Sequence, residues 1–222
     1  MEVVIIGNGG HSKVIQDMIT QINRYEVIAI LDDKYEMKKI DNGTIYANLS
    51  YFFDLLKYDV KFVIAIGSNE IRKMIFEKIN LSLSRYLTII HPTAVVSSKA
   101  IIGSGTVIMP QAVVNTDTVV GSHCIINSGA IIEHGNVVGN FSHVSPNATL
   151  TGNVMIGEGV HIGASATVIP EKRIGNWSVI GAGSTVIQNI PSNSRAVGSP
   201  TRLLKDKHEK IKNQVVEFYD KT

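Results

Sequence analysis

Histidine is the side chain of this sequence best suited to moving protons near neutral pH, because its unperturbed pKa lies near ~6.5. Four of the seven histidines fall between residues 120 and 165, at His123, His134, His143 and His161. A neutral imidazole could take the proton that an attacking amine loses. His143 and His161 are 18 residues apart and could instead bind a metal ion if the fold brings them together. Most histidines in proteins have only a structural role, so the residues around each histidine must show whether it transfers protons or binds a ligand.

A glycine turn near the N-terminus is the second feature with chemical potential. Gly7-Asn-Gly9-Gly10 follows the apolar residues 3–6 and precedes a predicted helix over 11–22. Glycines let a backbone approach a phosphate, and a helix N-terminus favours negative charge. Position 12 is Ser, so the third glycine of the dinucleotide fingerprint is missing, and a tight turn without a ligand is the alternative.

The elements around this turn alternate between strand and helix. Strands are predicted over 3–6, 27–31 and 61–66, and helices over 11–22, 49–56 and 69–82. This is one βαβαβ half of a nucleotide-binding fold, and the missing second half argues against a dehydrogenase. Asp32 and Asp33 end the second strand, where they could accept hydrogen bonds from a ribose or a base, or could simply be solvated. We place the domain at residues 1–88.

The second half of the chain has a period of six. From Ile90 to Val186, every sixth residue is Ile, Val or Leu, and the position four residues later is usually small or β-branched. Neither a helix nor an amphipathic strand requires this period, whereas a β-solenoid with one inward side chain per hexad does. A bare solenoid acting as a spacer or an ice-binding surface is disfavoured, because its faces carry scattered His and Asn residues.

The hexads resemble the repeats of the left-handed β-helix acyltransferases. The resemblance implies a left-handed parallel β-helix over 89–204, with three hexads in each triangular coil and equivalent side chains stacked every 18 residues. General rules of crossover handedness would favour the opposite hand. The charged tail, 205–222, has helical character.

The whole chain up to about residue 204 resembles the bacterial nucleotide-sugar acetyltransferases of the sialic-acid and bacillosamine type. The likeness is carried by Gly7-Asn-Gly-Gly-His-Ser-Lys-Val, Leu31-Asp-Asp, Ile66-Gly-Ser-Asn and the repeat. It implies that the Rossmann-like N-terminal domain binds a nucleotide-activated amino sugar. The residues implied in that site are Gly9, Gly10, His11, Asp32, Asp33 and Ser68.

The same resemblance implies that acetyl-CoA is the co-substrate and lies along the solenoid between neighbouring subunits of a homotrimer. The segment Ala196-Val-Gly-Ser-Pro-Thr-Arg202 resembles the family's closing segment, where Arg202 or Lys205 could meet phosphates. The residues implied in the cofactor groove are His143, Gly152, His161, Gly163, Ala164, Ala182 and Arg202.

The stretch from Asn127 to His134, followed nine residues later by His143, resembles the family's catalytic stretch. The resemblance implies that His134 is the general base and that His143 lies near the thioester, with no metal ion. Family members usually carry Glu or Asp directly after the base, and here the residue is Gly135. Asn127, Glu133 or a backbone carbonyl must then orient the ring; Glu133 is a poor candidate because adjacent strand residues point to opposite faces.

Composition narrows the setting. The net charge of +2 gives no reason to expect nucleic-acid binding or membrane insertion, and from the residue pattern we expect neither a signal peptide nor a membrane-spanning run. The single cysteine, Cys124, occupies a corner position of the repeat, where a buried small residue is more usual than a nucleophile. With no intrachain disulfide possible, we expect a cytoplasmic protein.

The resemblance therefore implies an acetyl-CoA-dependent N-acetyltransferase acting on a nucleotide-linked 4-amino-4,6-dideoxy sugar in surface polysaccharide or glycan biosynthesis. O-acetylation of a sugar such as sialic acid is an alternative on the same scaffold. Gly135 leaves a third possibility, a trimeric β-helix that has lost activity.

Overall fold

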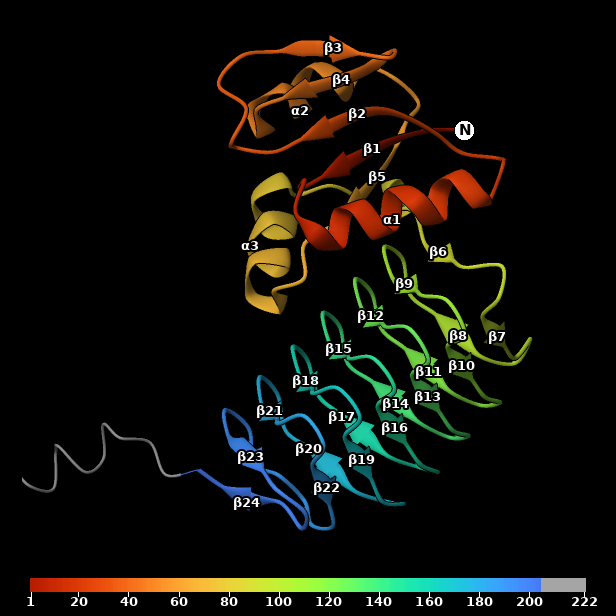
Figure 1. Ribbon diagram of the computed structural model, residues 1–222, viewed down its shortest axis with the longest axis vertical. Helices are drawn as coiled ribbons and strands as arrows, with labels where there is room; N and C mark the ends of the chain where they lie inside the picture. The colour runs from red at the N-terminus through yellow and green to blue at the C-terminus, as the bar shows by residue number, and fades with distance from the viewer. Residues whose placement is uncertain (205–222) are drawn as a thin grey trace, which may run out of the picture.

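The computed structural model describes residues 1–204, in which an α/β layer sits on one end of a long β-solenoid (Figure 1). The tail expected to be helical, 205–222, lies outside the described residues. Within residues 1–204, the structure has no helix that is long and apolar enough to cross a membrane.

The N-terminal layer is a five-stranded sheet with the order β3-β4-β2-β1-β5, parallel except for the edge strand β3. Strand β1 lies between β2 and β5, and its Val-Val-Ile-Ile run is buried on both faces, as is typical of parallel strands. One face packs on α1 and on the first solenoid coils, and the other on α2 and α3. The elements are β1 (Glu2–Ile6), α1 (Gly10–Gln21), β2 (Glu26–Leu31), β3 (Lys39–Asp41), β4 (Thr44–Ala47), η1 (Leu49–Tyr51), α2 (Phe52–Leu55), β5 (Lys61–Ile64), α3 (Asn69–Ile79) and η2 (Leu83–Arg85).

Two details differ from the sequence-based expectation. The β3–β4 hairpin was not predicted, although its Asn42-Gly43 turn, with positive φ at both residues, is a strong hairpin signal. Helix α3 ends at Ile79 rather than at residue 82, because Asn80 adopts the left-handed conformation with φ 50°.

The solenoid is built from strands of two residues, or three in β23, that form three sheets, parallel except for the last strand β24. We name each sheet after its first strand. The β6 sheet contains β6 (Ile89–Ile90), β9 (Val107–Ile108), β12 (Ile125–Ile126), β15 (His143–Val144), β18 (His161–Ile162), β21 (Val179–Ile180), β23 (Arg195–Val197) and the antiparallel β24 (Arg202–Leu203). The β7 sheet contains β7 (Val95–Val96), β10 (Val113–Val114), β13 (Ile131–Ile132), β16 (Thr149–Leu150), β19 (Thr167–Val168) and β22 (Thr185–Val186). The β8 sheet contains β8 (Ile101–Ile102), β11 (Val119–Val120), β14 (Val137–Val138), β17 (Met155–Ile156) and β20 (Arg173–Ile174).

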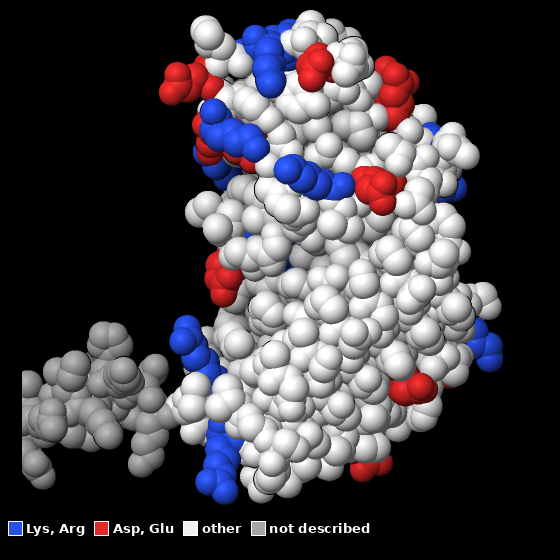
Figure 2. Space-filling view, viewed as in Figure 1, with Lys and Arg blue, Asp and Glu red and all other residues white. Residues whose placement is uncertain are grey.

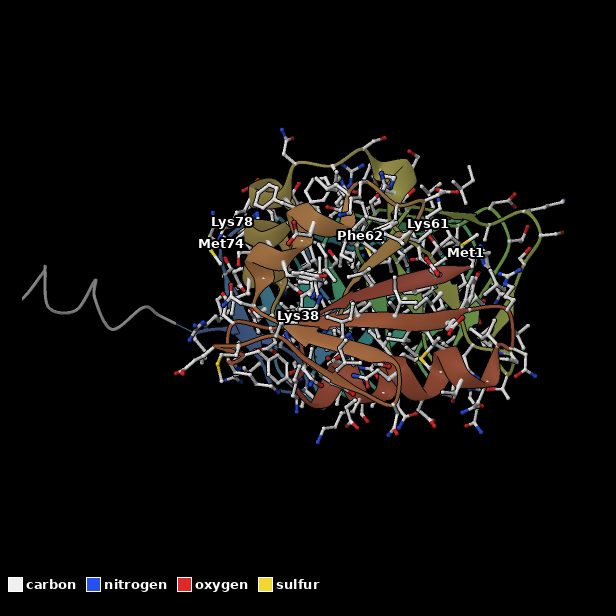
Figure 3. All side chains as sticks on the ribbon, turned by 90° about the horizontal axis from the view of Figure 1, so that it is seen from above. Met1, Lys38, Lys61, Phe62, Met74 and Lys78 are labelled. Atoms are coloured by element: carbon white, nitrogen blue, oxygen red, sulfur yellow. The ribbon has the colours of Figure 1, made fainter. Side chains whose placement is uncertain are left out.

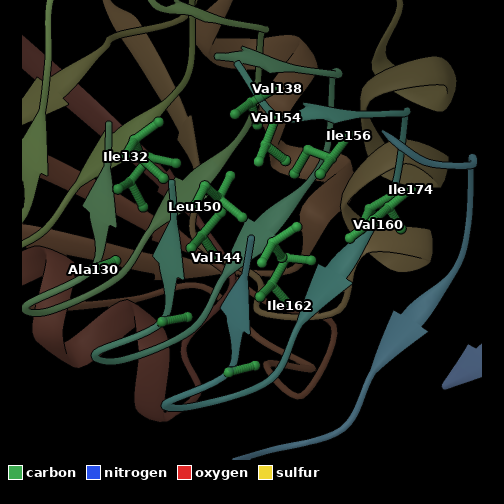
Figure 4. Close-up of a cluster of buried hydrophobic side chains, with 14 of the residues drawn as sticks. Ala130, Ile132, Val138, Val144, Leu150, Val154, Ile156, Val160, Ile162 and Ile174 are labelled. Atoms are coloured by element: carbon green, nitrogen blue, oxygen red, sulfur yellow. The ribbon is translucent and has the colours of Figure 1, made fainter. Parts of the chain in front are cut away.

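The period-six residues form the solenoid core, as predicted (Figure 4). From Ile108 to Val186 each of them is at most 3% exposed. Ile90 pairs with Ile108 in the same frame but is 40% exposed, because the first coil has no complete coil above it. The frame ends after Val186, where Ile190 rather than residue 192 bridges to Ile174.

Candidate active site

A pocket of about 420 Å³ opens where the N-terminal domain meets the β6 sheet. One wall is the β5–α3 connection and the start of α3, and the other is the outer surface of the solenoid. The pocket is lined by Gly67, Ser68, Asn69, Glu70, His143, Gly159, His161 and Val179. The structure thus brings three of the predicted site residues, Ser68, His143 and His161, into one place.

The two pocket histidines are ladder neighbours and stack at 4.9 Å between ring centroids. Each ring uses Nε2 to bond a side chain at the corner one coil above: His143 pairs with Asn127 Nδ2 at 2.9 Å, and His161 with Ser145 Oγ at 2.9 Å. Because an amide Nδ2 only donates, His143 Nε2 accepts and its neutral ring carries the proton on Nδ1. Nδ1 approaches the Gly67 backbone but makes no hydrogen bond of normal geometry.

Burial keeps the site imidazoles neutral. It lowers the pKa of His143 to about 3, helped by the neighbouring His161 and by Arg72. Burial also lowers the pKa of His161, and the Glu70 carboxylate partly opposes that change. His11, at the start of α1, has a pKa lowered to about 4 by burial and then by Arg72, and its buried Nε2 has no partner among residues 1–204.

His134 lies elsewhere on the solenoid. It belongs to residues 133–136, the corner that joins the β7 sheet to the β8 sheet, whereas the pocket opens on the β6 sheet. In a triangular prism this corner is opposite the pocket face. The exposed His134 ring lies against Gly152 of the next coil, where an added Cβ would be 2.7 Å from Cε1 and 2.9 Å from Nε2. Gly152, expected in the cofactor groove, therefore leaves the space in which the His134 ring packs.

The two residues predicted to orient His134 have other partners. Asn127 bonds His143, and the Glu133 carboxylate accepts from Asn115 Nδ2 at 2.9 Å. Within residues 1–204 neither forms a hydrogen bond to the His134 ring. Gly135 has φ +68°, and an added Cβ would strike the Asn153 amide oxygen. Gly135 therefore contributes no side chain beside the ring, and the Asn153 amide lies where its Cβ would be.

The glycine turn contains one glycine that the packing requires and two that face free space. An added Cβ at Gly7, which has φ +100°, would be 2.8 Å from the Ile66 side chain, so this glycine is required by the fold. An added Cβ at Gly9 or Gly10 would meet nothing within 4 Å. The space in front of Gly9 and Gly10 is free for a ligand.

The acidic pair beside this turn has a structural role that the sequence did not reveal. Both Asp32 carboxylate oxygens accept backbone N–H groups, from Asn8 at 2.6 Å and from Lys34 at 3.1 Å. Asp33 is exposed and accepts from Leu49 N at 3.4 Å. Asp32 therefore ties the turn after β2 to the glycine turn after β1.

The remaining cofactor-groove residues follow one edge of the solenoid. Gly163 and Ala164 lie at a corner joining the β6 sheet to the β7 sheet, and Ala182 lies at the same corner one coil later. Gly163 is required by packing, since an added Cβ would be 2.5 Å from Ala182 N. Arg202 is exposed on β24, at the far end of the β6 sheet; Lys205 lies outside the described residues.

Sequence reasoning missed Glu70 and Ser145, and it treated Cys124 as more likely structural than catalytic. Glu70 accepts from Ser68 Oγ at 2.9 Å, and its own backbone N–H and this hydroxyl lower its pKa. Ser145 stands 16 residues before His161, the same spacing as Asn127 before His143, and this repeated spacing was the available signal for Ser145. Burial raises the pKa of the Cys124 thiol to about 11, which is unsuited to a nucleophile at neutral pH.

Comparison with known proteins explains this combination of domains. Residues 2–79 match the PglD N-terminal domain, and residues 99–134 match the bacterial transferase hexapeptide repeat. PerB from Caulobacter crescentus, solved with CoA and GDP-perosamine, is 30% identical with a TM-score of 0.84, over 92% of this chain and 98% of PerB. The chain belongs to the PglD-type hexapeptide acetyltransferase family.

Further members of the family agree with this placement. The acetyltransferase domain of PglB from Neisseria gonorrhoeae, in complex with acetyl coenzyme A, is 31% identical with a TM-score of 0.82, over 91% of this chain and 98% of that domain. A Bacillus subtilis UDP-N-acetylbacillosamine N-acetyltransferase is 43% identical over 106 residues, which span 47% of this chain and about half, 49%, of that relative. The predicted fold, a Rossmann-like domain followed by a left-handed parallel β-helix, is confirmed.

Proposed function

We propose that the protein transfers the acetyl group of acetyl-CoA to the amino group of a nucleotide-linked 4-amino-4,6-dideoxy sugar, in the cytoplasmic synthesis of a surface glycan. The observation that carries this proposal is the pocket between the N-terminal domain and the solenoid, with its two neutral histidines. The open space at Gly9 and Gly10 suits the nucleotide, and the likeness to PerB with CoA and GDP-perosamine supports this class of substrate.

The chemistry follows from the ring positions. An amine attacking a thioester loses a proton as the tetrahedral centre forms, and the His134 imidazole takes that proton. The same step places negative charge on the thioester oxygen, which needs a preorganised donor. The His143 Nδ1–H group, held in that tautomer by Asn127, is free of a well-formed bond and can serve as this donor.

One chain does not assemble these groups, because His134 lies at the corner opposite the pocket. We therefore infer a homotrimer in which His134 of one protomer completes the pocket of its neighbour. Beside the His134 corner, the β8 sheet exposes a ladder of apolar side chains, which supports a subunit contact there. The solenoid surface seen in Figure 2 carries few charges. The ladder consists of Ile101, Val119, Val137 and Met155.

A shared site predicts that two inactive variants can complement each other in mixed trimers. His134→Ala and His143→Ala should each be nearly inactive. In trimers refolded from an equal mixture, about one interface in four combines an intact His134 with an intact His143, so the mixture should regain up to about a quarter of the wild-type activity. Turnover of the mixtures is compared with that of the unmixed variants, and light scattering measures the assembly. A fully active monomer, or mixtures no more active than their components, would contradict the shared site.

A substitution at Gly10 should affect ligand binding without affecting the stability of the fold. Gly10→Val should raise the KM for the sugar nucleotide at least tenfold, whereas the KM for acetyl-CoA and the Tm stay near wild type, since its Cβ meets no protein atom. Asp32→Ala is the contrasting variant: it removes the acceptor of two backbone bonds, so its KM change should be accompanied by a lower Tm. Equal KM changes for both substrates in Gly10→Val would place the nucleotide outside this domain.

The direct test of the proposed function is acetyl-CoA turnover, followed as free thiol, with a panel of UDP-, dTDP- and GDP-linked amino sugars. Acetylation of amine acceptors alone is the expected result. Acetylation of hydroxyl acceptors in place of amines would favour the O-acetyltransferase alternative. No turnover with any member of the panel would favour a β-helix that has lost activity.

A further inference from the structure

At the solenoid corners that face α3, one backbone carbonyl in each coil accepts no backbone hydrogen bond. Residues 121–124, 139–142 and 157–160 join the β8 sheet to the β6 sheet. The third residue of each corner has positive φ: 55° at His123, 58° at Phe141 and 66° at Gly159. Neighbouring carbonyls join the coil-to-coil ladder, as when Ser122 O accepts from Phe141 N, but among residues 1–204 these three carbonyls accept no backbone N–H.

Two side chains of α3 supply the missing donors in three consecutive coils. Arg72 donates from Nε to His123 O at 2.8 Å and from Nη2 to Phe141 O at 2.8 Å. Asn69 donates from Nδ2 to Gly159 O at 3.1 Å. The three acceptors are 18 residues apart, so α3 is attached to equivalent points of three successive coils.

Arg72 is also tied to its own domain. Nη1 donates to Ile66 O at 2.8 Å and to Gly67 O at 3.2 Å, and Nη2 donates to Asn69 Oδ1 at 2.8 Å. All five guanidinium N–H groups are therefore used. The side chain is 1% exposed and has no carboxylate partner among residues 1–204, and burial lowers its pKa to about 10, so it stays charged at neutral pH.

This rigid attachment differs from the ordinary contacts of the same helix. Lys73 bonds Glu158 at 2.6 Å, but both side chains are about one third exposed, and exposed ion pairs contribute little to stability. Met74 and Lys78 lie at the outer edge of the molecule in Figure 3, and Met74 is 57% exposed. Only the first turn of α3 is anchored in the solenoid by fully buried polar groups.

The anchored segment is also a wall of the pocket. Gly67 and Asn69 line it on the side of the N-terminal domain, opposite His143 and His161. The bonds from Arg72 to Gly67 O and to the coil carbonyls therefore set the distance between the two walls. We propose that Arg72 and Asn69 are positioning residues that hold the sugar nucleotide, bound by the N-terminal domain, at reacting distance from the acetyl donor on the solenoid.

The inference rests on the proposed function and predicts a particular kinetic pattern. A displacement of about 1 Å between reactants can cost about 10²-fold in rate without weakening the binding of either one. Arg72→Met should therefore lower kcat about 10²-fold, and Asn69→Ala about tenfold, while calorimetric Kd values for acetyl-CoA and for the sugar nucleotide change less than about threefold. Arg72→Lys should not restore kcat, because an ammonium cannot bond both coils and the β5–α3 connection together.

Lys73→Met is the matched control, since it removes a contact of the same helix with the same corner and should leave kcat unchanged. Hydrogen exchange adds a readout that needs no turnover: amides of residues 66–70 should exchange faster in Arg72→Met and Asn69→Ala but not in Lys73→Met. If Arg72→Met does not fold, Asn69→Ala, which leaves the guanidinium in place, gives the answer.

Three outcomes overturn the inference: unchanged kcat with a lower Tm, a large loss of affinity for both substrates, or unchanged exchange at residues 66–70. An inactive wild-type protein would instead count against the proposed function, and the exchange measurement would still decide whether α3 sets the pocket wall.

Discussion

His134→Ala is expected to lower kcat by about 10²–10⁴-fold, the usual range for loss of a general base, with little change in acetyl-CoA binding. The reason is that the ring is the group predicted to take the proton from the attacking amine. The measurement is steady-state turnover with the best amino-sugar acceptor, together with the Kd for acetyl-CoA.

Gly152→Ala provides a second test of the same ring. Its added Cβ would be 2.7 Å from His134 Cε1, so the imidazole must move although it is still present. We expect kcat to fall at least tenfold with unchanged Kd values. A His134→Ala variant with more than half of the wild-type kcat would remove this residue from the mechanism.

His123→Phe is expected to stabilise the protein and to reduce its sensitivity to acid. The His123 ring is buried among Phe76, Tyr86 and Phe141, stacked at 5.3 Å on Phe141, and neither ring nitrogen has a partner among residues 1–204. Removing such orphaned groups should raise the free energy of unfolding by about 1–3 kcal/mol. Phenylalanine fits the backbone, because Phe141 occupies the equivalent position one coil later with φ 58°.

The pH dependence follows from the pKa. Burial, and then the nearby Arg72, lowers the pKa of His123 to about 4, below the ~6.5 of an unfolded chain. Between these values the unfolded state binds the proton and the folded state does not, so stability is lost as pH falls from about 6.5 to 4, by up to about 1.4 kcal/mol per pH unit. His123→Phe should remove this part of the slope, whereas His11 and His143 continue to contribute theirs.

Urea unfolding at several pH values between 4 and 7 measures both effects. Tyr86→Phe is the matched control: it removes another buried, unpartnered polar atom of the same cluster but no group that titrates in this range. It should raise stability without changing the slope. An unchanged acid slope in His123→Phe would show that His123 does not remain neutral in the folded protein.

The sequence predicted the fold well because the information is local and repeated. Each hexad places one aliphatic side chain in the core, so the frame from Ile108 to Val186 could be found by counting. The same counting could have placed the histidines. His134 and His143 are nine residues apart, which is half of an 18-residue coil, so they must lie on opposite sides of the prism.

The docking of α3 could not be predicted in this way. Arg72 has the spacing of an ordinary residue on a helix, and only the tertiary contact between α3 and the solenoid corners makes it a buried group. Likewise, the role of Asp32 depends on the meeting of two strand ends that are far apart in the sequence. The role of a residue cannot be predicted from sequence patterns when its partners belong to another helix, strand or domain.

The attachment of α3 to three consecutive coils limits how such a protein can change in length during evolution. A solenoid accepts the duplication or loss of a whole 18-residue coil with little harm to its core, because each coil contacts only its neighbours. Between His123 and Gly159, however, an extra coil would carry the lower acceptors about 4.8 Å down the axis, out of register with Arg72 and Asn69. Viable length variants should therefore gain or lose coils only after Val179, beyond the coils that bond α3 and line the pocket.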